Sequence, residues 1–322
     1  MATITKRKLK KEAFIYLFAG ITAIFVITIL IINYYNDYKY QQTFEFKLLE
    51  HGYSKEDTEE LLNRLNEEEL EEVLTKEKNE SRIKFLKETY YIKKNMDAYL
   101  EYEKENSELS SYDIVAIVNT HANQNWYEKT EPANLELGTL LLVNKYYYLD
   151  ETYVPENLVN VSNWYCYGEH KMVEEAYQAF INMYNKALES DIKLIINSSY
   201  RSYEDQENTY NQLKKTYGTE RAEQQAARPG HSEHETGLSF DVFTSGYSTT
   251  SEFKNSDAYA WLKEHAHQFG FIERYPEDKE YITGYAFESW HWRYVGKEIA
   301  QKIYEEQITL DEYYAYYIEN QS

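Results

Sequence analysis

Hydrophobic and polar residues alternate irregularly along most of the chain, but residues 13–32, near its start, are twenty consecutive uncharged and mostly apolar residues. This run, AFIYLFAGITAIFVITILII, is apolar on every face and long enough to cross a bilayer as a helix. Five basic residues precede it, so we expect residues 1–12 to be a cytoplasmic tail, 13–35 to span the membrane, and the rest to lie outside. A cleaved signal peptide is the alternative, although the run exceeds the usual length of about 7–15 residues and no A-x-A site follows.

A charge-rich segment with helical spacing follows, over residues 36–110, in which glycine and proline are scarce. Ser54 is a candidate N-cap with Asp57 three residues later, and the leucines that follow recur at helical spacing. A second helix is expected over residues 82–102. The segment therefore predicts a helical stalk or subdomain that holds the rest of the chain away from the membrane. A module that binds the cell wall or a partner is the alternative.

Beyond residue 110 the pattern changes to short β-branched or aromatic runs mixed with amphipathic helices. Helices and strands without regular alternation indicate an α+β domain, residues 111–322, built on a small antiparallel sheet with flanking helices. Ser256 and Gly270 are the expected N-cap and C-terminal stop of one helix. The expected strands are YDIVAIVNT (112–120), TLLLVNKYYYL (139–149), KLIINSSYRS (193–202) and FESWHWRYVG (287–296), and the expected helices are 169–189, 256–270 and a last one from about 297.

Composition excludes two classes of function. The chain has 34 basic and 55 acidic residues, of which five basic residues and one acidic residue lie within residues 1–12. The rest of the chain therefore has 29 basic and 54 acidic residues, a net charge of −25. Such an acidic body repels phosphates, so we expect no nucleic-acid partner. Cys166 is the single cysteine, which excludes an internal disulfide and a cysteine-based zinc cluster.

Candidate chemistry is concentrated in SEHETGLSFD, residues 232–241. The end of this stretch alternates, so Phe240 points to the core while Asp241 points to the opposite face. His234 precedes Asp241 by seven residues, across a turn that Gly237 permits, so the two side chains can meet. An imidazole and a carboxylate together suit a borderline cation such as zinc.

A third ligand is available in ESWHW, where His291 follows Glu288 by three positions. Two histidines and one aspartate leave one zinc position open for water, as a catalytic site requires, and zinc lowers the pKa of bound water to about 7. Glu288 is the candidate general base. A regular strand would place Glu288 and His291 on opposite faces, so a bulge or strand end is expected here.

These motifs resemble those of the VanY-type zinc D-alanyl-D-alanine carboxypeptidases, over roughly residues 140–300. SEHETGLSFD is similar to their S-x-H-x-x-G-x-A-x-D motif, ESWH to their E-x-W-H, and SSYRSYEDQ (198–206) to their arginine-bearing segment. Ser239 stands where the motif has alanine, and a buried hydroxyl there needs a partner. The resemblance implies that zinc is bound by His234, Asp241 and His291. It further implies that Glu288 is the general base and that Arg201 stabilises the oxyanion. The residues expected to contact substrate are Ser232, Gln206 and Trp290.

The resemblance further implies a bacterial enzyme that removes the terminal D-alanine from peptidoglycan stem peptides, and the helix expected over residues 13–35 would be its single membrane anchor. Several alternatives stay open at the level of the sequence. The same scaffold serves L,D-carboxypeptidases and peptidoglycan endopeptidases, and a non-catalytic wall-binding module is a further possibility. Glu288 favours an enzyme, because a structural zinc site needs no free base.

Overall fold

The computed structural model describes residues 2–245 and 250–321. The chain forms two compact units, residues 1–91 and 92–322. Residues 92–110, which we expected in the stalk, therefore pack with the second unit. The assignment of functional domains to these units stays a prediction.

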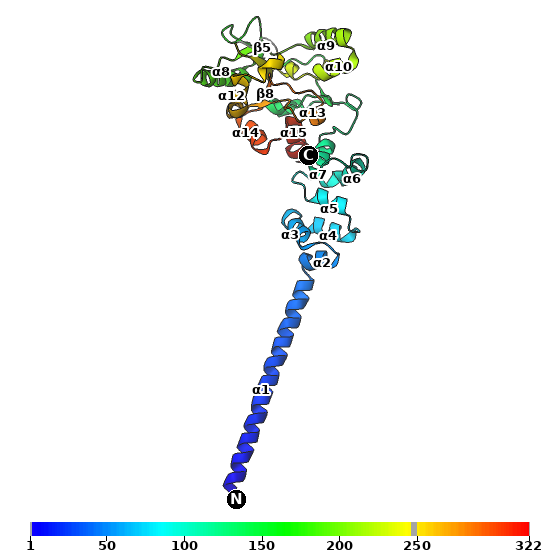
Figure 1. The fold of residues 1–322 in the computed structure, drawn as a ribbon, viewed down its shortest axis with the longest axis vertical. Coiled ribbons are helices and arrows are strands. Elements are labelled where there is room, and N and C mark those ends of the chain that lie inside the picture. Colours follow the sequence, from blue (N-terminus) through cyan, green and yellow to red (C-terminus); the bar gives the residue numbers. More distant parts are fainter. Residues whose placement is uncertain (1, 246–249, 322) are drawn as a thin grey trace. The chain divides into compact units, whose positions relative to one another are not determined.

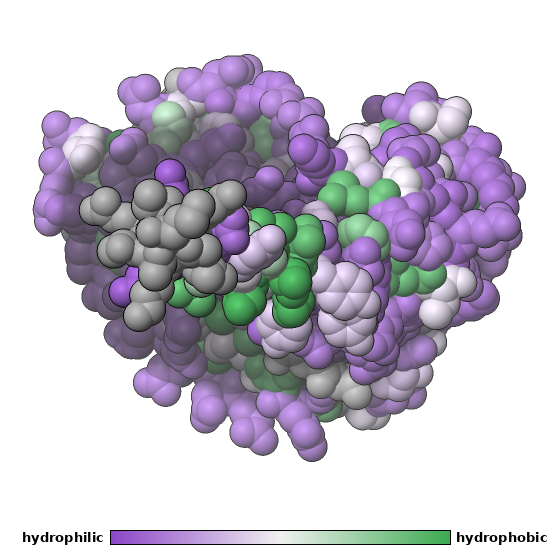
Figure 2. All heavy atoms as spheres, turned by 90° about the horizontal axis from the view of Figure 1, so that it is seen from below, coloured by the Kyte–Doolittle hydropathy of each residue, from purple (hydrophilic) through white to green (hydrophobic). Residues whose placement is uncertain are grey.

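The first unit begins with α1 (Ala2–Gln41), a continuous helix of 40 residues (Figure 1). From Lys10 to Gln41 it is long and apolar enough to cross a membrane, a property that a signal sequence would share. Most of the exposed large hydrophobic side chains of the described residues belong to it, between Phe14 and Tyr40. By contrast, hydrophilic residues cover most of the face shown in Figure 2.

Short capped helices complete the first unit. Ser54 is the N-cap of its helix and accepts a hydrogen bond from the backbone N–H of Asp57, as predicted. Leu48, Leu61 and Phe85 are fully buried and form part of its core. The continuous helix predicted over residues 82–102 is wrong, because the chain leaves helical geometry after Leu86. The helices are α2 (Phe44–Glu50), α3 (Lys55–Arg64), α4 (Glu67–Thr75) and α5 (Glu80–Leu86).

The second unit corrects two of the predicted strands. Residues 112–120 form most of α7 (Ser111–Asn119), capped by Ser110, and not a strand. Its apolar residues are buried on nearly every side, so the run lacks the polar face that marks a helix in sequence. In the run 139–149 the strand is confined to Tyr147–Tyr148.

The other elements of the second unit surround a central sheet. Ser256 caps α12, and Gly270 ends the 3₁₀ turn after it in the left-handed conformation, as predicted. The helices are α6 (Met96–Glu105), α8 (Glu174–Leu188), α9 (Tyr203–Tyr217), α10 (Thr219–Gln225), α11 (Thr250–Phe253), α12 (Asp257–His265), α13 (Glu280–Thr283), α14 (Lys297–Glu306) and α15 (Leu310–Tyr317). Two small strand pairs are β1 (Glu131–Pro132) with β2 (Tyr147–Tyr148), and β3 (Leu158–Asn160) with β4 (Lys171–Val173).

The central sheet has four strands in the order β5-β6-β8-β7, and all neighbours are antiparallel, as predicted. In β6 and β8 the register pairs Phe240 with Trp292 and Asp241 with His291. Paired residues share a face, so the sheet has a core face and an opposite face that carries Asp241 and His291. The strands are β5 (Ile195–Ser198), β6 (Ser239–Phe243), β7 (Phe271–Glu273) and β8 (His291–Tyr294).

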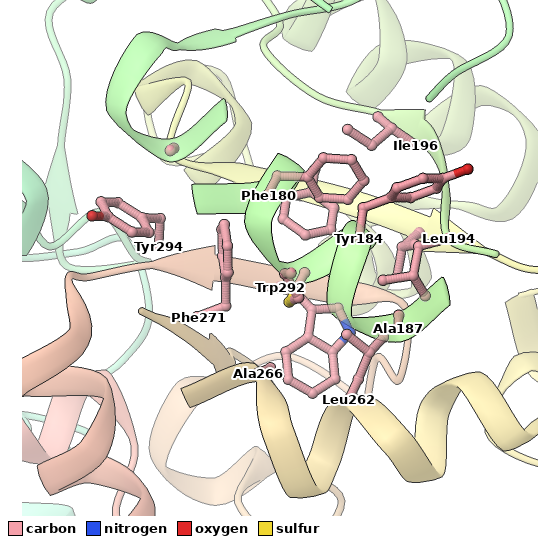
Figure 3. Close-up of a cluster of buried hydrophobic side chains, with 14 of the residues drawn as sticks. Phe180, Tyr184, Ala187, Leu194, Ile196, Leu262, Ala266, Phe271, Trp292 and Tyr294 are labelled. Carbon is pink, nitrogen blue, oxygen red and sulfur yellow. The ribbon is translucent and has the colours of Figure 1, made fainter. Parts of the chain in front are cut away.

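The core face packs against α8 and the α12 region. Phe180 of α8 meets Phe240 edge-on with ring centroids 5.1 Å apart, and Phe240 meets Phe271 at 5.2 Å. Figure 3 shows Phe180 and Phe271 in one cluster with Trp292 of β8. The opposite face, defined here as the site face, carries Ser239, Asp241, His291 and Arg293.

Candidate active site

The three predicted metal ligands converge on the site face. One ligand atom each of His234, Asp241 and His291 lies within 4.8 Å of the others, and all three residues are buried. His234 Nε2 lies 3.5 Å and His291 Nδ1 lies 3.0 Å from Asp241 Oδ1. The predicted convergence of side chains distant in sequence is therefore confirmed.

Local backbone geometry produces this convergence. Asp241 and His291 are direct partners across β6 and β8. His234 lies in a 3₁₀ turn, residues Glu233–Thr236, that ends at Gly237 in the left-handed conformation, φ 66°. A side chain is disfavoured at that φ, and a Cβ on Gly237 would come within 3.0 Å of Leu158. The glycine therefore allows the chain to reverse and place His234 beside the strand that follows.

Glu288 lies in a turn immediately before β8, so the strand end that we expected is present. The backbone N–H of His291 donates to the Glu288 carbonyl at 3.1 Å. The Glu288 carboxylate consequently lies 4.0 Å from His291 Nδ1. Burial raises the pKa of Glu288 to about 7, and Asp241 acts in the same direction against His291 and Arg201. A carboxylate with a pKa near neutrality is suited to accept and return a proton.

His234 is held in the form that a metal ligand requires. Its Nδ1 lies 2.8 Å from the Ser199 carbonyl oxygen, which can only accept, so Nδ1 carries the proton and Nε2 carries the lone pair. Burial and the nearby Arg201 lower the pKa of His234 to about 4. The ring is therefore neutral at pH 7, with Nε2 facing Asp241.

His291 differs in its charge. Burial disfavours its charged form, but the Asp241 and Glu233 carboxylates outweigh burial together and raise the pKa of His291 to about 9. The same interactions, with those of His234, hold the pKa of Asp241 well below its usual range despite burial. A cation that binds at His291 would therefore have to displace a proton from it at neutral pH.

Arg201 lies at the edge of this group, 3.8 Å from Asp241 Oδ2. Its guanidinium donates to Ser198 Oγ at 2.9 Å and to Gln206 Oε1 at 3.1 Å. Gln206 is almost fully buried and donates in turn to the Ala227 carbonyl. In this conformation Gln206 therefore holds Arg201 in place, and its predicted contact with substrate stays a prediction.

Ser232 and Trp290 also lie close in sequence to the ligands. Ser232 is buried and forms a capping box with Glu235 at the start of the 3₁₀ turn that carries His234. Trp290 is half-buried and packs against the core cluster of the second unit. Their roles in substrate binding stay predictions.

Sequence reasoning missed a buried ionic cluster below the site. Glu233 Oε1 accepts hydrogen bonds from Arg274 Nε at 2.8 Å and Arg293 Nη1 at 2.7 Å. Arg274 Nη1 also donates to Asp311 of α15 at 2.6 Å. All four side chains are at most 2% exposed. A signal for it was present in the sequence, because Arg274 and Arg293 each stand among aromatic residues, where a charge needs a buried partner.

The donor set fits a zinc ion. Two imidazoles and one carboxylate within 4.8 Å match a catalytic zinc site with one open position. The hydrogen bond from His234 Nδ1 to a backbone carbonyl is the arrangement that orients a ligating histidine. A cavity of about 540 Å³ elsewhere in this unit, lined by His267, Glu273 and Ile303 among others, contains none of the residues predicted for the site.

Comparison with known proteins agrees with this geometry. A family model for VanY D-alanyl-D-alanine carboxypeptidase matches residues 169–297. YodJ of Bacillus subtilis is 36% identical over 181 residues, covering 54% of this chain and 66% of YodJ. A D-alanyl-D-alanine carboxypeptidase of Enterococcus faecium is 32% identical over 228 residues, covering 67% of this chain and 71% of that protein.

Among solved structures, the LdcB LD-carboxypeptidase is similar to this chain with a TM-score of 0.55 and 34% identity. The match covers 59% of this chain and 91% of LdcB. The chain thus spans between 66% and 91% of the length of these three relatives.

Proposed function

Because the chain belongs to the VanY family of D-alanyl-D-alanine carboxypeptidases, we propose that it is a zinc-dependent enzyme that removes the terminal D-alanine from peptidoglycan stem peptides. We further propose that α1 anchors it in the membrane, with the second unit outside the cell. The observation that carries the proposal is the convergence of His234, Asp241 and His291 within 4.8 Å, beside Glu288. Buried groups of this kind, with perturbed pKa values, are typical of catalytic sites.

In this proposal His234, Asp241 and His291 hold zinc. Zinc, when bound, supplies a Lewis acid that polarises the scissile carbonyl and lowers the pKa of water. Glu288 accepts a proton from the attacking water and returns it to the amine of the departing D-alanine. The buried position that raises the pKa of Glu288 to about 7 makes both transfers accessible near neutral pH.

Arg201 is the proposed electrostatic partner of the reaction. Its hydrogen bonds to Ser198 and Gln206 fix the guanidinium beside Asp241 before substrate arrives. A fixed cation next to developing negative charge stabilises the transition state without reorganisation. The proposed role is therefore to stabilise the oxyanion that forms on the scissile carbonyl.

The proposal is tested with the full chain in detergent and two synthetic stem peptides. One is a pentapeptide that ends in D-alanyl-D-alanine, and the other is a tetrapeptide that ends in a single D-alanine. We expect loss of one D-alanine from the pentapeptide by mass spectrometry, loss of activity with a chelator, and recovery with zinc. Activity that survives complete metal removal contradicts the proposal.

The tetrapeptide and a cross-linked dimer distinguish the alternatives on the same scaffold. Cleavage of the tetrapeptide alone indicates an L,D-carboxypeptidase, the activity named for LdcB. Release of an internal fragment from the dimer indicates an endopeptidase. Zinc binding without cleavage of any of these peptides indicates a wall-binding module.

Glu288→Gln tests the general base. The amide keeps the size of the side chain but cannot accept the proton, so we expect kcat to fall by about 10²–10⁴. Zinc content, measured by atomic absorption, should be retained because Glu288 is not a proposed ligand. Hydrolysis at the unmodified rate would remove Glu288 from the mechanism.

A further inference from the structure

Two buried polar atoms next to the metal site lack a hydrogen-bond partner among the described residues and face each other. They are His291 Nε2 and Glu233 Oε2, 3.9 Å apart. The two side chains are 3% and 0% exposed. An unsatisfied buried polar atom is costly, so the facing arrangement of a ring N–H and a carboxylate oxygen calls for an explanation.

The rest of the Glu233 carboxylate is firmly held. Both Arg274 and Arg293 donate to its other oxygen, Oε1. Arg274 is itself held by Asp311, and the two arginines and two carboxylates balance in charge. The cluster therefore fixes the position of Glu233 and leaves Oε2 directed at His291.

We infer that Glu233 is a positioning residue for the metal ligand His291. It accepts a hydrogen bond from His291 Nε2–H, which keeps the proton on Nε2 and presents the Nδ1 lone pair to zinc. Ligating histidines commonly donate their second ring N–H to a carboxylate in this way. The observed 3.9 Å exceeds a hydrogen bond, and a shift of about 1 Å would bring the two atoms within hydrogen-bond distance.

This inference rests on the proposed function, because it concerns the same zinc site. It adds that the C-terminal helix α15 supports the site through Asp311 and Arg274. Asp311 Oδ1 also accepts a hydrogen bond from Asn144 at 2.7 Å, so residues from three distant parts of the chain hold this support together.

Glu233→Gln is the sharpest test. The two arginines require an acceptor at the Oε1 position, so the amide oxygen occupies it and the NH₂ group replaces Oε2. The amide NH₂ donor then faces the His291 Nε2–H donor. This repulsion disfavours the tautomer with the proton on Nε2, which is the one that presents Nδ1 to zinc. We expect zinc affinity, measured by competition with a chelating dye, to fall by about 10–100-fold. The visible absorption spectrum of the cobalt-loaded chain should also change.

Asp311→Asn is the matched control. It removes the same single negative charge from the same cluster, but Asp311 contacts Arg274 and Asn144 and not His291. Because Asp311 acts on the site only through Arg274, we expect this variant to lose much less zinc affinity than Glu233→Gln and, since the oxygen that faces His291 is kept, to retain the cobalt spectrum of the unmodified chain. Equal losses in the two variants, or no loss in Glu233→Gln, would overturn the inference.

A measurement on the unmodified chain covers the case in which Glu233→Gln does not fold. Nitrogen-15 NMR of histidine-labelled, zinc-loaded chain should show the proton of His291 on Nε2. Zinc on Nε2 with the proton on Nδ1 would overturn the inference while leaving the proposed function intact. An unmodified chain that binds no zinc would contradict the proposed function itself.

Discussion

At the scale of single residues, Ser239 and His291 lie on the same face of the sheet, but the Ser239 hydroxyl and the His291 Nδ1 atom differ in their polar partners. Ser239 is fully buried, and its Oγ has no hydrogen-bond partner among the described residues. His291 Nδ1 lies 3.0 Å from Asp241 Oδ1, an interaction that favours a proton on the ring in the absence of metal. The unpaired hydroxyl of Ser239 affects the stability of the fold, and the proton on His291 affects metal binding.

We expect Ser239→Ala to stabilise the protein by about 1 kcal/mol, because it removes a buried hydroxyl that has lost its hydrogen bonds to water. Chemical denaturation followed by circular dichroism measures the free energy of unfolding. Ser202→Ala is the control of opposite sign, because the Ser202 hydroxyl caps α9 and its loss costs about 1 kcal/mol. Destabilisation by Ser239→Ala would show that the hydroxyl has a partner, such as buried water.

Zinc binding should release at least one proton per ion at pH 7, because His291 must lose its proton to bind, and Glu288 and zinc-bound water, each with a pKa of about 7, add to the release. The pKa of His291 is raised to about 9, so its proton is bound at pH 7 and is displaced by the metal. The pKa of His234 is lowered to about 4, so it contributes none. Release should disappear as the pH rises through about 9, and apparent affinity should increase over the same range.

Titration calorimetry in two buffers of different ionisation enthalpy measures this release. The observed binding enthalpy should differ between the buffers at pH 7 and converge above pH 9. Identical enthalpies at pH 7 would mean that His291 is already neutral.

At the scale of elements, the turn between His234 and β6 determines whether the ligands meet. Gly237 takes φ 66°, and its carbonyl accepts a hydrogen bond from the Val173 N–H at 3.0 Å. Side chains of Leu158, Val173 and Pro155 lie within 3.0–3.3 Å of the position that a Cβ on Gly237 would occupy. The turn is therefore held by both backbone conformation and packing.

Gly237→Ala should destabilise the protein by about 1–3 kcal/mol through its backbone conformation, with an added cost from the contact with Leu158. Zinc affinity should also fall, because His234 would move. Gly168→Ala is the matched control, since Gly168 has φ 87° but no atom near its added Cβ. Thermal unfolding of both variants separates strain from packing, and equal losses would contradict the packing contribution.

At the scale of the whole molecule, the chain joins one apolar helix to a strongly acidic remainder. Apolar side chains are unfavourable in water, whereas charged side chains are favourable in it. None of the most apolar 18-residue stretch of α1 is buried against the rest of the protein. Its apolar side chains therefore need an apolar environment outside the protein, such as a membrane. The proposed catalytic and metal-binding residues, by contrast, all lie within residues 201–291 of the second unit. The proposed anchor and the proposed active site thus belong to separate parts of the chain.

Deleting residues 2–41 should make the protein soluble without detergent and leave hydrolysis of soluble stem peptides unchanged. The physical reason is that α1 supplies no group to the proposed site. Membrane fractionation of cells expressing the full and shortened chains, with peptide assays on both, measures the two effects. A folded but inactive shortened chain would assign α1 a role in catalysis.

The sequence by itself determined the features that depend on local pattern. The alternation in β6 placed Asp241 opposite Phe240, and the caps Ser54 and Ser256 located two helix starts. Motif order predicted the residues of the proposed site. Alternation and capping act over a few residues, so they can be read without knowledge of neighbours. The strand predicted at 112–120 is wrong because a helix buried on nearly every side has no polar stripe to mark it in the sequence.

Only the tertiary structure decided which distant charges share the interior. Glu233, Arg274, Arg293 and Asp311 are separated by up to 78 positions, and no spacing rule links them. The contact of Gln206 with Arg201, five positions away in the same motif, also depends on tertiary structure, because burial and the Ala227 carbonyl fix the Gln206 side chain. Pairing of buried charges depends on which elements meet in space, and that is determined by the packing of the whole second unit.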